Sequence, residues 1–209
     1  MTELLKTGTT TVGIVCKDAI ILAADKRATA GNFIVDKKVE KVRPINDRLA
    51  VTTAGSVSDL QLLVRYLRSE LKLKEIRSGR SSTIKEAANL LSGMIYGNIR
   101  SFSVIPGITH FLLAGYDTDV HLYDLYPDGS LTPIDDFVSS GSGSVFAYGV
   151  LESQYKANMT KEEGIAMAKA AVNVALQRDS ASGNGIDVYC VSSQGVVKVE
   201  TKLVSTSVI

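Results

Sequence analysis

The chain has 209 residues, 45% of them hydrophobic, and a formal net charge of +1 at pH 7. This length suits one large domain with a substantial buried core. The balanced charge excludes a basic stripe for nucleic acid, and no apolar stretch reaches the ~18 residues that a membrane span needs. The opening MTELLKTG lacks the apolar core of a secretory signal, so we expect a soluble, cytoplasmic protein with no nucleic-acid or membrane partner.

The first fifty residues contain β-branched and apolar runs that are typical of strands. Asn46 and Asp47 separate the last two runs, and these residue types bond their own backbone in turns. An antiparallel sheet is therefore expected in this half of the chain. The runs are TTTVGIVC (9–16), AIILAADK (19–26), FIV (33–35), KVRPI (41–45) and RLAVTTAG (48–55).

Helices are expected after this block of strands. Apolar residues spaced by three and four predict the face of a helix that begins near Ser56 or Ser58. Capping boxes at Thr83–Glu86 and Thr160–Glu163 predict the starts of two more helices. The apolar faces are Val57, Leu60, Val64, Leu67 and Leu71 in the first helix, Ala87, Leu91, Met94, Ile95 and Ile99 in the second, and Ile165, Ala168, Val172 and Ala175 in the third.

Strand-like runs return in the second half, at 109–117, 119–126, 186–193 and 196–204. Strands and helices therefore come in blocks, without the strict βαβ alternation of a parallel sheet. Each block of strands can form an antiparallel sheet with helices on its outer face. Two such sheets packed together give an α+β fold, a four-layer αββα sandwich, although periodicity alone leaves the stacking of the sheets open.

The two cysteines, Cys16 and Cys190, lie in apolar runs and lack the close spacing of a zinc or redox motif. Buried packing is their expected role. A nucleophilic Cys/His pair with His110 or His121 is the alternative, but no third residue in the sequence orients such a pair. We expect neither a metal nor a cofactor.

Polar residues gather where the apolar runs end, and sites are often built at such positions. Each has an ordinary interpretation: Lys41 as a solvated lysine, and Asp25 as a turn residue or a partner of Lys26 or Arg27. The segment SSGSGS (139–144) is typical of a flexible loop and lacks the GK[ST] of a phosphate-binding loop. The segment RDSASGNG (178–185) is typical of a helix end stopped by glycine.

Taken together, these segments resemble the catalytic β subunits of the proteasome core particle, within the N-terminal nucleophile hydrolases, and most of all the archaeal form. The resemblance runs from residue 7 to about residue 190 and implies the αββα sandwich. The matching segments are TGTTTVGI, DKRAT, VEKV, TTAGSVSD, GSGSVFAYGVLESQY and RDSASG.

The resemblance implies that residues 1–8 are a propeptide and that 9–209 form the mature catalytic domain. Cleavage between Gly8 and Thr9 would make Thr9 the first residue, with its Oγ as nucleophile and its α-amine as base. Such an amine has a reference pKa of roughly 7.7 to 8.0, which suits a base near neutral pH. Glycine at position 8 permits the tight turn that self-cleavage needs. Propensity alone makes Thr9 an ordinary strand threonine.

Further roles follow from the resemblance by position. Lys41 would lie beside Thr9, where its charge favours the deprotonated hydroxyl and amine, and Asp25 would hold Lys41 charged. Gly55 would donate its backbone N–H to the oxyanion. The residues that would hydrogen-bond around the Thr9 amine are Ser142, Asp179 and Ser182.

The resemblance also implies a substrate and partners. Ala28, Val39, Thr53 and Val57 would line the pocket for the residue that precedes the cut, and because they are uncharged we expect large or apolar residues there. The partners would be a seven-membered β ring, flanking rings of α-type subunits (α7β7β7α7), an unfoldase ATPase at the α rings, and unfolded polypeptide as substrate.

Two alternatives remain. One is a structural ring subunit without activity, but the Gly8–Thr9 junction and Lys41 weigh against it. The other is a different amidase with an N-terminal nucleophile, or the bacterial two-component relative that works with an ATPase ring. The propeptide and the match over GSGSVFAYGVLESQY disfavour this second alternative.

Overall fold

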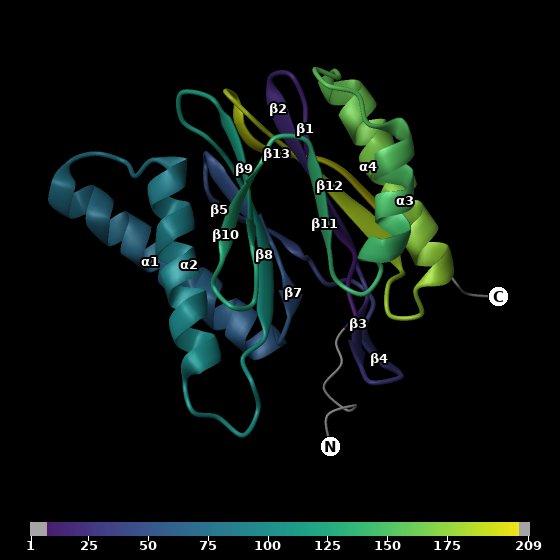
Figure 1. Cartoon of the computed structure of the whole chain (residues 1–209), viewed down its shortest axis with the longest axis horizontal. Helices are drawn as coiled ribbons and strands as arrows, with labels where there is room; N and C mark the ends of the chain where they lie inside the picture. The colour runs from purple at the N-terminus through teal and green to yellow at the C-terminus, as the bar shows by residue number, and fades with distance from the viewer. Residues whose placement is uncertain (1–7, 205–209) are drawn as a thin grey trace.

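A computed structural model describes residues 8–204 of the chain. Its elements form four layers (Figure 1), with two antiparallel sheets in the middle and a pair of helices on each outer face. The expected αββα sandwich is therefore confirmed, including the stacking of the two sheets that periodicity left open.

The first sheet has five strands in the order β11-β1-β2-β12-β13, and every neighbouring pair is antiparallel. It joins strands from the start of the chain to strands from its end, and the second sheet also contains strands from both halves. The expectation that each block of strands forms a sheet of its own is therefore wrong, because long-range pairing decides which strands are neighbours. The strands are β1 (Thr11–Val15), β2 (Ala19–Asp25), β11 (Phe137–Ser140), β12 (Gly185–Ser192) and β13 (Gly195–Leu203).

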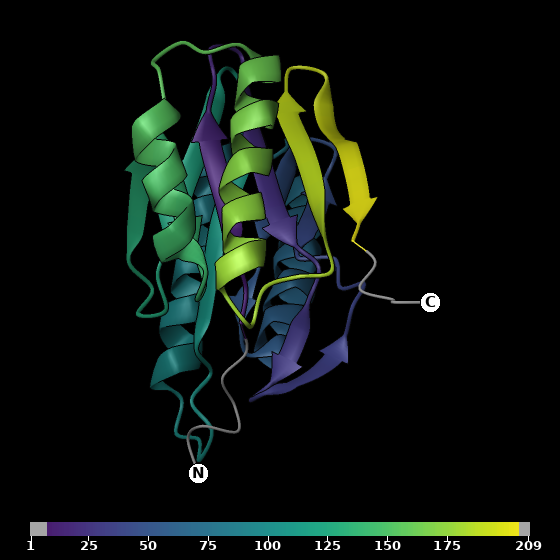
Figure 2. The same cartoon turned by 90° about the vertical axis from the view of Figure 1, so that its right-hand side faces the viewer.

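The second sheet follows the order β10-β9-β8-β6-β5, with the short β7 paired to β8. A separate hairpin of β3 and β4 projects beyond the end of β2 (Figure 2). The strands are β3 (Ala28–Ala30), β4 (Phe33–Asp36), β5 (Val42–Asn46), β6 (Leu49–Thr52), β7 (Ala54–Gly55), β8 (Thr109–Tyr116), β9 (Val120–Leu125) and β10 (Leu131–Ile134).

Helices α1 and α2 cover the second sheet, and α3 and α4 cover the first. Both predicted capping boxes are present, at Thr83 before α2 and at Thr160 before α4. The four helices are α1 (Val57–Ser78), α2 (Ile84–Arg100), α3 (Ser144–Gln154) and α4 (Lys161–Arg178).

Helix α3 begins inside the segment 139–144, at Ser144, and the first two residues of the segment lie in β11, so the interpretation of this segment as a flexible loop is wrong. The helix buries only Ala147 and Leu151 completely, so its sequence carries no continuous apolar stripe. A helix with so narrow a buried face has little periodic signal, and tertiary packing against α4 and β11 stabilises it instead.

Strand β2 illustrates why the sheets stack. Its side chains alternate, so Ile21 and Ala23 pack under α3 and α4 whereas Ile20, Leu22 and Ala24 pack against the second sheet. Both faces are apolar, and both must be covered to leave water. The strand therefore holds Asp25, at its end, in the interior of the protein.

Candidate active site

The Gly8–Thr9 junction lies in the interior, with Thr9 only 5% exposed. The Thr9 hydroxyl donates a hydrogen bond of 2.6 Å to the carbonyl oxygen of Gly8, the residue before it. Lys41 Nζ donates to the same oxygen at 3.2 Å. The Gly8 N–H in turn donates to Thr29 Oγ1 at 3.0 Å. The Gly8 carbonyl oxygen therefore accepts hydrogen bonds from both a hydroxyl and an ammonium group.

Lys41 is buried, which overturns its interpretation as a solvated lysine. Its side chain is 4% exposed and lies 2.7 Å from Asp25 Oδ1, with Asp25 fully buried. Burial lowers the pKa of Lys41 from its ordinary value, while the charge and hydrogen bond of Asp25 oppose that change. A carboxylate at this distance favours the charged lysine, next to the Gly8 carbonyl.

Asp25 accepts four hydrogen bonds, and only one comes from a side chain. Besides Lys41 Nζ, the backbone N–H of Thr10 donates to Oδ1 at 2.9 Å, and those of Arg27 and Gly183 donate to Oδ2 at 3.0 Å each. The bond from the Arg27 N–H is typical of a turn residue, which was one interpretation of Asp25, whereas an ion pair with Lys26 or Arg27 is not formed, because Lys26 pairs with Asp187 and the Arg27 side chain bonds the loop after α4. Asp25 thus joins the start of β1, Lys41 and the loop after α4.

A second hydrogen-bonded group meets the backbone nitrogen of Thr9. That N–H donates to Ser142 Oγ at 3.3 Å, and Ser142 Oγ donates to Asp179 Oδ2 at 2.6 Å. Ser182 Oγ donates to the same carboxylate oxygen at 2.6 Å and lies 2.7 Å from Thr10 Oγ1. All six residues with side-chain roles in the predicted site are therefore brought together, from five separate segments.

Two glycines, Gly141 and Gly143, let the segment before α3 pack closely against the backbone of Thr9 and the side chain of Thr10. Gly141 has a φ of +92°, and a Cβ there would lie 2.1 Å from the Thr9 carbonyl oxygen. Gly143 donates its N–H to that oxygen at 3.2 Å, and a Cβ on Gly143 would lie 2.0 Å from Thr10 Oγ1. The alternating glycines in SSGSGS, interpreted from the sequence as a flexible loop, instead permit this close packing, whereas no sequence signal marks Thr29.

The loop after α4 also differs from a simple glycine-stopped helix. The helix ends at Arg178, and Asp179 caps it in an extended conformation with φ −91°. The Arg27 guanidinium holds the loop through Ser180 O and Asn184 Oδ1, both at 2.8 Å. Gly183 does not stop the helix but allows the Arg27 guanidinium to pack against the loop, since a Cβ at position 183 would lie 2.2 Å from it.

A cavity of about 660 Å³ opens beside Gly8, Thr9 and Lys41. Gly55 lines it with a φ of +120°, and a Cβ at Gly55 would lie 2.2 Å from the Ile108 carbonyl oxygen. Glycine is therefore required there for geometry as well as for approach to the site. The predicted pocket residues Ala28, Val39, Thr53 and Val57 all line this cavity.

The cavity is more charged than those four residues indicate. Six basic residues line it, against the acidic Asp36 and Glu40, in a chain whose net charge is only +1. The prediction of large or apolar residues before the cut rested on those four uncharged residues alone and did not take these charges into account. The basic residues of the cavity are Arg27, Lys38, Lys41, Arg43, Arg65 and Arg68.

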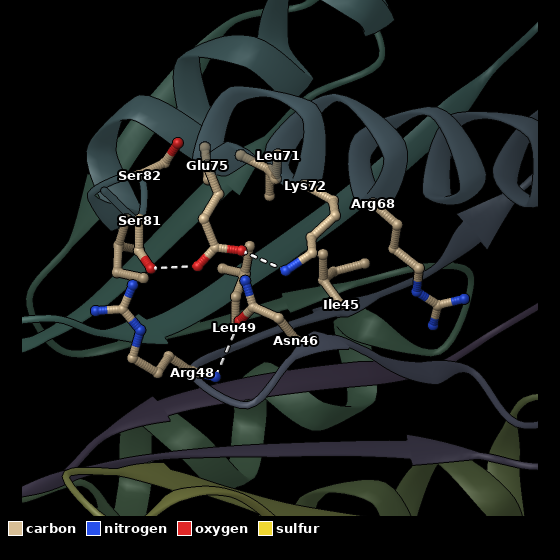
Figure 3. A pocket seen from close by; sticks show the side chains of 12 residues that line it. Ile45, Asn46, Arg48, Leu49, Arg68, Leu71, Lys72, Glu75, Ser81 and Ser82 are labelled. Carbon is tan, nitrogen blue, oxygen red and sulfur yellow. Dashed lines mark hydrogen bonds and ion pairs between the residues drawn. The ribbon is translucent and has the colours of Figure 1, made fainter. Parts of the chain in front are cut away.

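A smaller cavity of about 130 Å³ lies along the second half of α1 (Figure 3). There Glu75 bridges two segments, accepting hydrogen bonds of 2.8 Å from both Lys72 Nζ and Ser81 Oγ. The side chains form an exposed polar network around the α1–α2 connection. This cavity contains none of the residues at the Gly8–Thr9 junction.

Other candidate chemistry in the chain is not supported by the structure. Cys16 and Cys190 are buried in the core under α3 and α4, as expected, and burial raises the pKa of the Cys16 thiol to about 12. His110 bonds Asp124 instead of a cysteine. Between residues 8 and 204, no group of three His, Cys, Asp or Glu side chains is arranged to hold a metal ion, and no helix has the length and apolarity to cross a membrane.

Residues 5–191 match the family model described as "Proteasome subunit". The chain belongs to the proteasome subunit family. It is 45% identical to proteasome subunit beta 1 of Thermococcus onnurineus, over 93% of both chains. The proteasome subunit beta of Methanocaldococcus vulcanius is 44% identical over 90% of this chain and 84% of its own, and that of Methanococcus maripaludis strain C5 is 42% identical over 90% and 85%.

These similarities identify the chain as a β subunit of the proteasome core, of the archaeal type expected from the sequence. The family is one of proteases, so the chain is a hydrolase of that class, and membership implies assembly into the core rings with α subunits. The similarity does not distinguish a catalytic β subunit from a structural one. That distinction depends on the chemistry of the Gly8–Thr9 junction.

Proposed function

We propose that this proteasome subunit is a threonine endopeptidase, made as a precursor that cleaves itself between Gly8 and Thr9. The observation that carries the proposal is the shared contact at Gly8 O, where Thr9 Oγ1 lies at 2.6 Å and Lys41 Nζ at 3.2 Å. A nucleophile and a cation at one carbonyl are what intramolecular acyl transfer requires.

In the proposed self-cleavage, Thr9 Oγ attacks the carbonyl carbon of Gly8 and gives up its proton. Negative charge develops on the Gly8 oxygen, where the ammonium of Lys41 stabilises it. The C–N bond then breaks, the Thr9 nitrogen takes up a proton, and an ester joins Gly8 to Thr9 Oγ. Water hydrolyses the ester, which releases residues 1–8 with a new carboxylate at Gly8 and restores the Thr9 hydroxyl beside its free α-amine.

The released amine would lie in a site that already contacts that nitrogen. Ser142, backed by Asp179, accepts the Thr9 N–H at 3.3 Å in the precursor. In the mature enzyme we propose that the amine takes the Oγ proton, directly or through water, while Thr9 attacks a substrate carbonyl. Ser182 orients Asp179, and Gly55 is proposed as the oxyanion donor because it lines the cavity beside Thr9.

The remaining elements of the proposal follow from family membership. We propose a heptameric β ring between heptameric α rings, an unfoldase ATPase that delivers chains through the α rings, and unfolded polypeptide in the cytoplasm as substrate. Residues 1–8 are then a propeptide, and 9–209 form the mature catalytic domain. No cofactor takes part in the proposed steps.

A structural ring subunit is the alternative, and the two functions predict different masses. We expect intact-mass analysis of the subunit assembled with its α-type partner to give a chain that begins TTTVGI. The Thr9→Ala variant should keep all of residues 1–8 and hydrolyse no fluorogenic peptide. Retention of Met1–Gly8 on every copy of an active wild-type particle would contradict the proposal.

A further inference from the structure

The cavity beside Thr9 has a wall of mixed character. Helix α1 starts directly after Gly55, and its first turns present Val57, Leu60 and Val64 to the cavity. Arg65 follows eight residues after Val57, so it lies about 12 Å farther along the helix axis. The α1 wall of the cavity therefore combines apolar side chains with a cation two turns into the helix.

Strand β5 brings a second cation close to the junction. Arg43 follows Lys41 by two residues, and both side chains line the cavity, as alternation along an extended segment requires. The two Cα atoms are about 6 to 7 Å apart along such a segment. Arg43 thus lies one strand repeat beyond the lysine that contacts the Gly8 carbonyl.

Three of the six cations are already engaged elsewhere. Lys41 pairs with Asp25, the Arg27 guanidinium bonds the loop after α4, and Arg68 donates to the Pro44 carbonyl oxygen. These groups stabilise the walls of the cavity. The cations left to meet an occupant are Lys38, Arg43 and Arg65.

The acidic residues of the lining neutralise these remaining cations only in part. Glu40 lies 4.0 Å from Arg43 but only 2.7 Å from Lys198, whose hydrogen bond lowers the pKa of Glu40. Glu40 therefore pairs mainly with Lys198 and only weakly with Arg43. Asp36 is exposed and accepts a hydrogen bond from its own turn at 2.8 Å. Within residues 8–204, Arg65 has no carboxylate partner at ion-pair distance.

We propose that this cavity selects an acidic side chain, above all glutamate, at the substrate position that precedes the cut, with Arg43 and Arg65 determining the preference. The methylene groups of a glutamate can pack on the apolar side chains of the α1 wall, and its carboxylate can pair with the guanidinium groups of Arg65, which has no carboxylate partner, and of Arg43, which Glu40 neutralises only in part. This inference rests on the proposed protease function. It replaces the preference for large or apolar residues that the four uncharged pocket residues predicted.

The test compares fluorogenic peptides that differ only in the residue before the cut, using glutamate, its uncharged isostere glutamine, and leucine. The enzyme is the subunit assembled with its α-type partner. We expect kcat/KM to be about fivefold higher for glutamate than for glutamine at about 50 mM salt, and the ratio to fall at about 500 mM salt as the charges are screened.

Matched variants assign the preference to the cavity. Arg43→Gln combined with Arg65→Gln should bring the glutamate-to-glutamine ratio close to one. Arg77→Gln removes the same charge from an exposed position on the same helix, outside the cavity, and should leave the ratio unchanged. A wild-type ratio of one or less, or a ratio that the double variant does not alter, overturns the inference while leaving the protease function standing. A particle that cleaves none of the three peptides overturns both.

Discussion

Two buried lysine–aspartate pairs lie side by side at the end of β2, and they differ in what the lysine can reach. Lys41 pairs with Asp25, and Lys26 pairs with Asp187, with every side chain 5% exposed or less. Lys41 also contacts the Gly8 carbonyl and lines the large cavity. Lys26 does not line that cavity. Its partner Asp187 also accepts a hydrogen bond of 2.7 Å from the Thr201 hydroxyl.

The two pairs show that burial of a lysine–aspartate pair does not by itself indicate a role in catalysis. Both pairs carry the cost of removing two charges from water, and breaking either one leaves an uncompensated charge inside the protein. Only Lys41 lies where charge would develop during cleavage. We therefore propose that the Lys26–Asp187 pair stabilises the first sheet, and that the Lys41–Asp25 pair contributes both to stability and to the proposed cleavage.

The largest expected effect comes from Lys41→Ala in a chain produced with Thr9 as its first residue, which bypasses processing. We expect at least a ~100-fold loss of turnover, because a charge that stabilises the nucleophile and amine is removed. Peptide hydrolysis per assembled particle is the measurement. Near-normal turnover by a correctly assembled variant would refute the role assigned to Lys41.

Lys26→Ala is the matched variant in the other pair. We expect the free energy of unfolding to fall by about 3–5 kcal/mol, because Asp187 loses its partner inside the sheet. Turnover per correctly assembled particle should stay near the wild-type value, since no atom of Lys26 meets the junction. Denaturant unfolding and peptide hydrolysis measure the two quantities. A loss of turnover like that of Lys41→Ala would remove the distinction between the pairs.

Gly8→Ala tests the contact with the junction while leaving both lysines in place. A Cβ at position 8 would lie 1.8 Å from Ala181 Cβ, so the backbone at Gly8 must shift, which disturbs the 3.2 Å contact of its carbonyl oxygen with Lys41 Nζ. We expect self-cleavage to slow by at least about tenfold, a loss in the range of one misplaced stabilising contact. Appearance of the mature mass over time is the readout.

Ala181→Gly supplies the control for that variant. It removes the nearest clashing atom, although the Ala181 backbone stays 2.8 Å from the added Cβ, so the double variant should recover part of the processing rate. Processing of Gly8→Ala at the wild-type rate would show that the tight junction has no kinetic role.

The smallest effect is expected at high pH. Burial lowers the pKa of Lys41 below its ordinary 10.5, so its charge is present below the lowered pKa and is lost as pH rises through it. The kcat/KM of the pre-processed enzyme should therefore decline at a pH below 10.5, and Lys41→Arg should abolish that decline at whatever rate it retains. Circular dichroism over the same range controls for unfolding. An unchanged decline in Lys41→Arg would assign it to another group.

Local patterns predicted most of the fold. The apolar periodicity of α1 and the capping boxes of α2 and α4 depend on neighbours within a few residues, so they are readable from the sequence. Helix α3 was missed because its two fully buried residues make no stripe. The resemblance of the motifs, in contrast, located the six polar side chains that the structure brings together.

What the sequence by itself determined is most of the elements and the family, together with a prediction of the site residues, because these depend on short-range pattern and on motif. Only the tertiary structure decided which carboxylate each buried lysine meets. Asp25 and Lys26 are adjacent in the chain, yet their partners are 16 and 161 residues away. Sheet pairing and sheet stacking make those choices, and the same long-range packing brings Arg43 and Arg65 to one cavity. No local pattern contains that information, because hydrophobic burial acts on the whole sandwich at once.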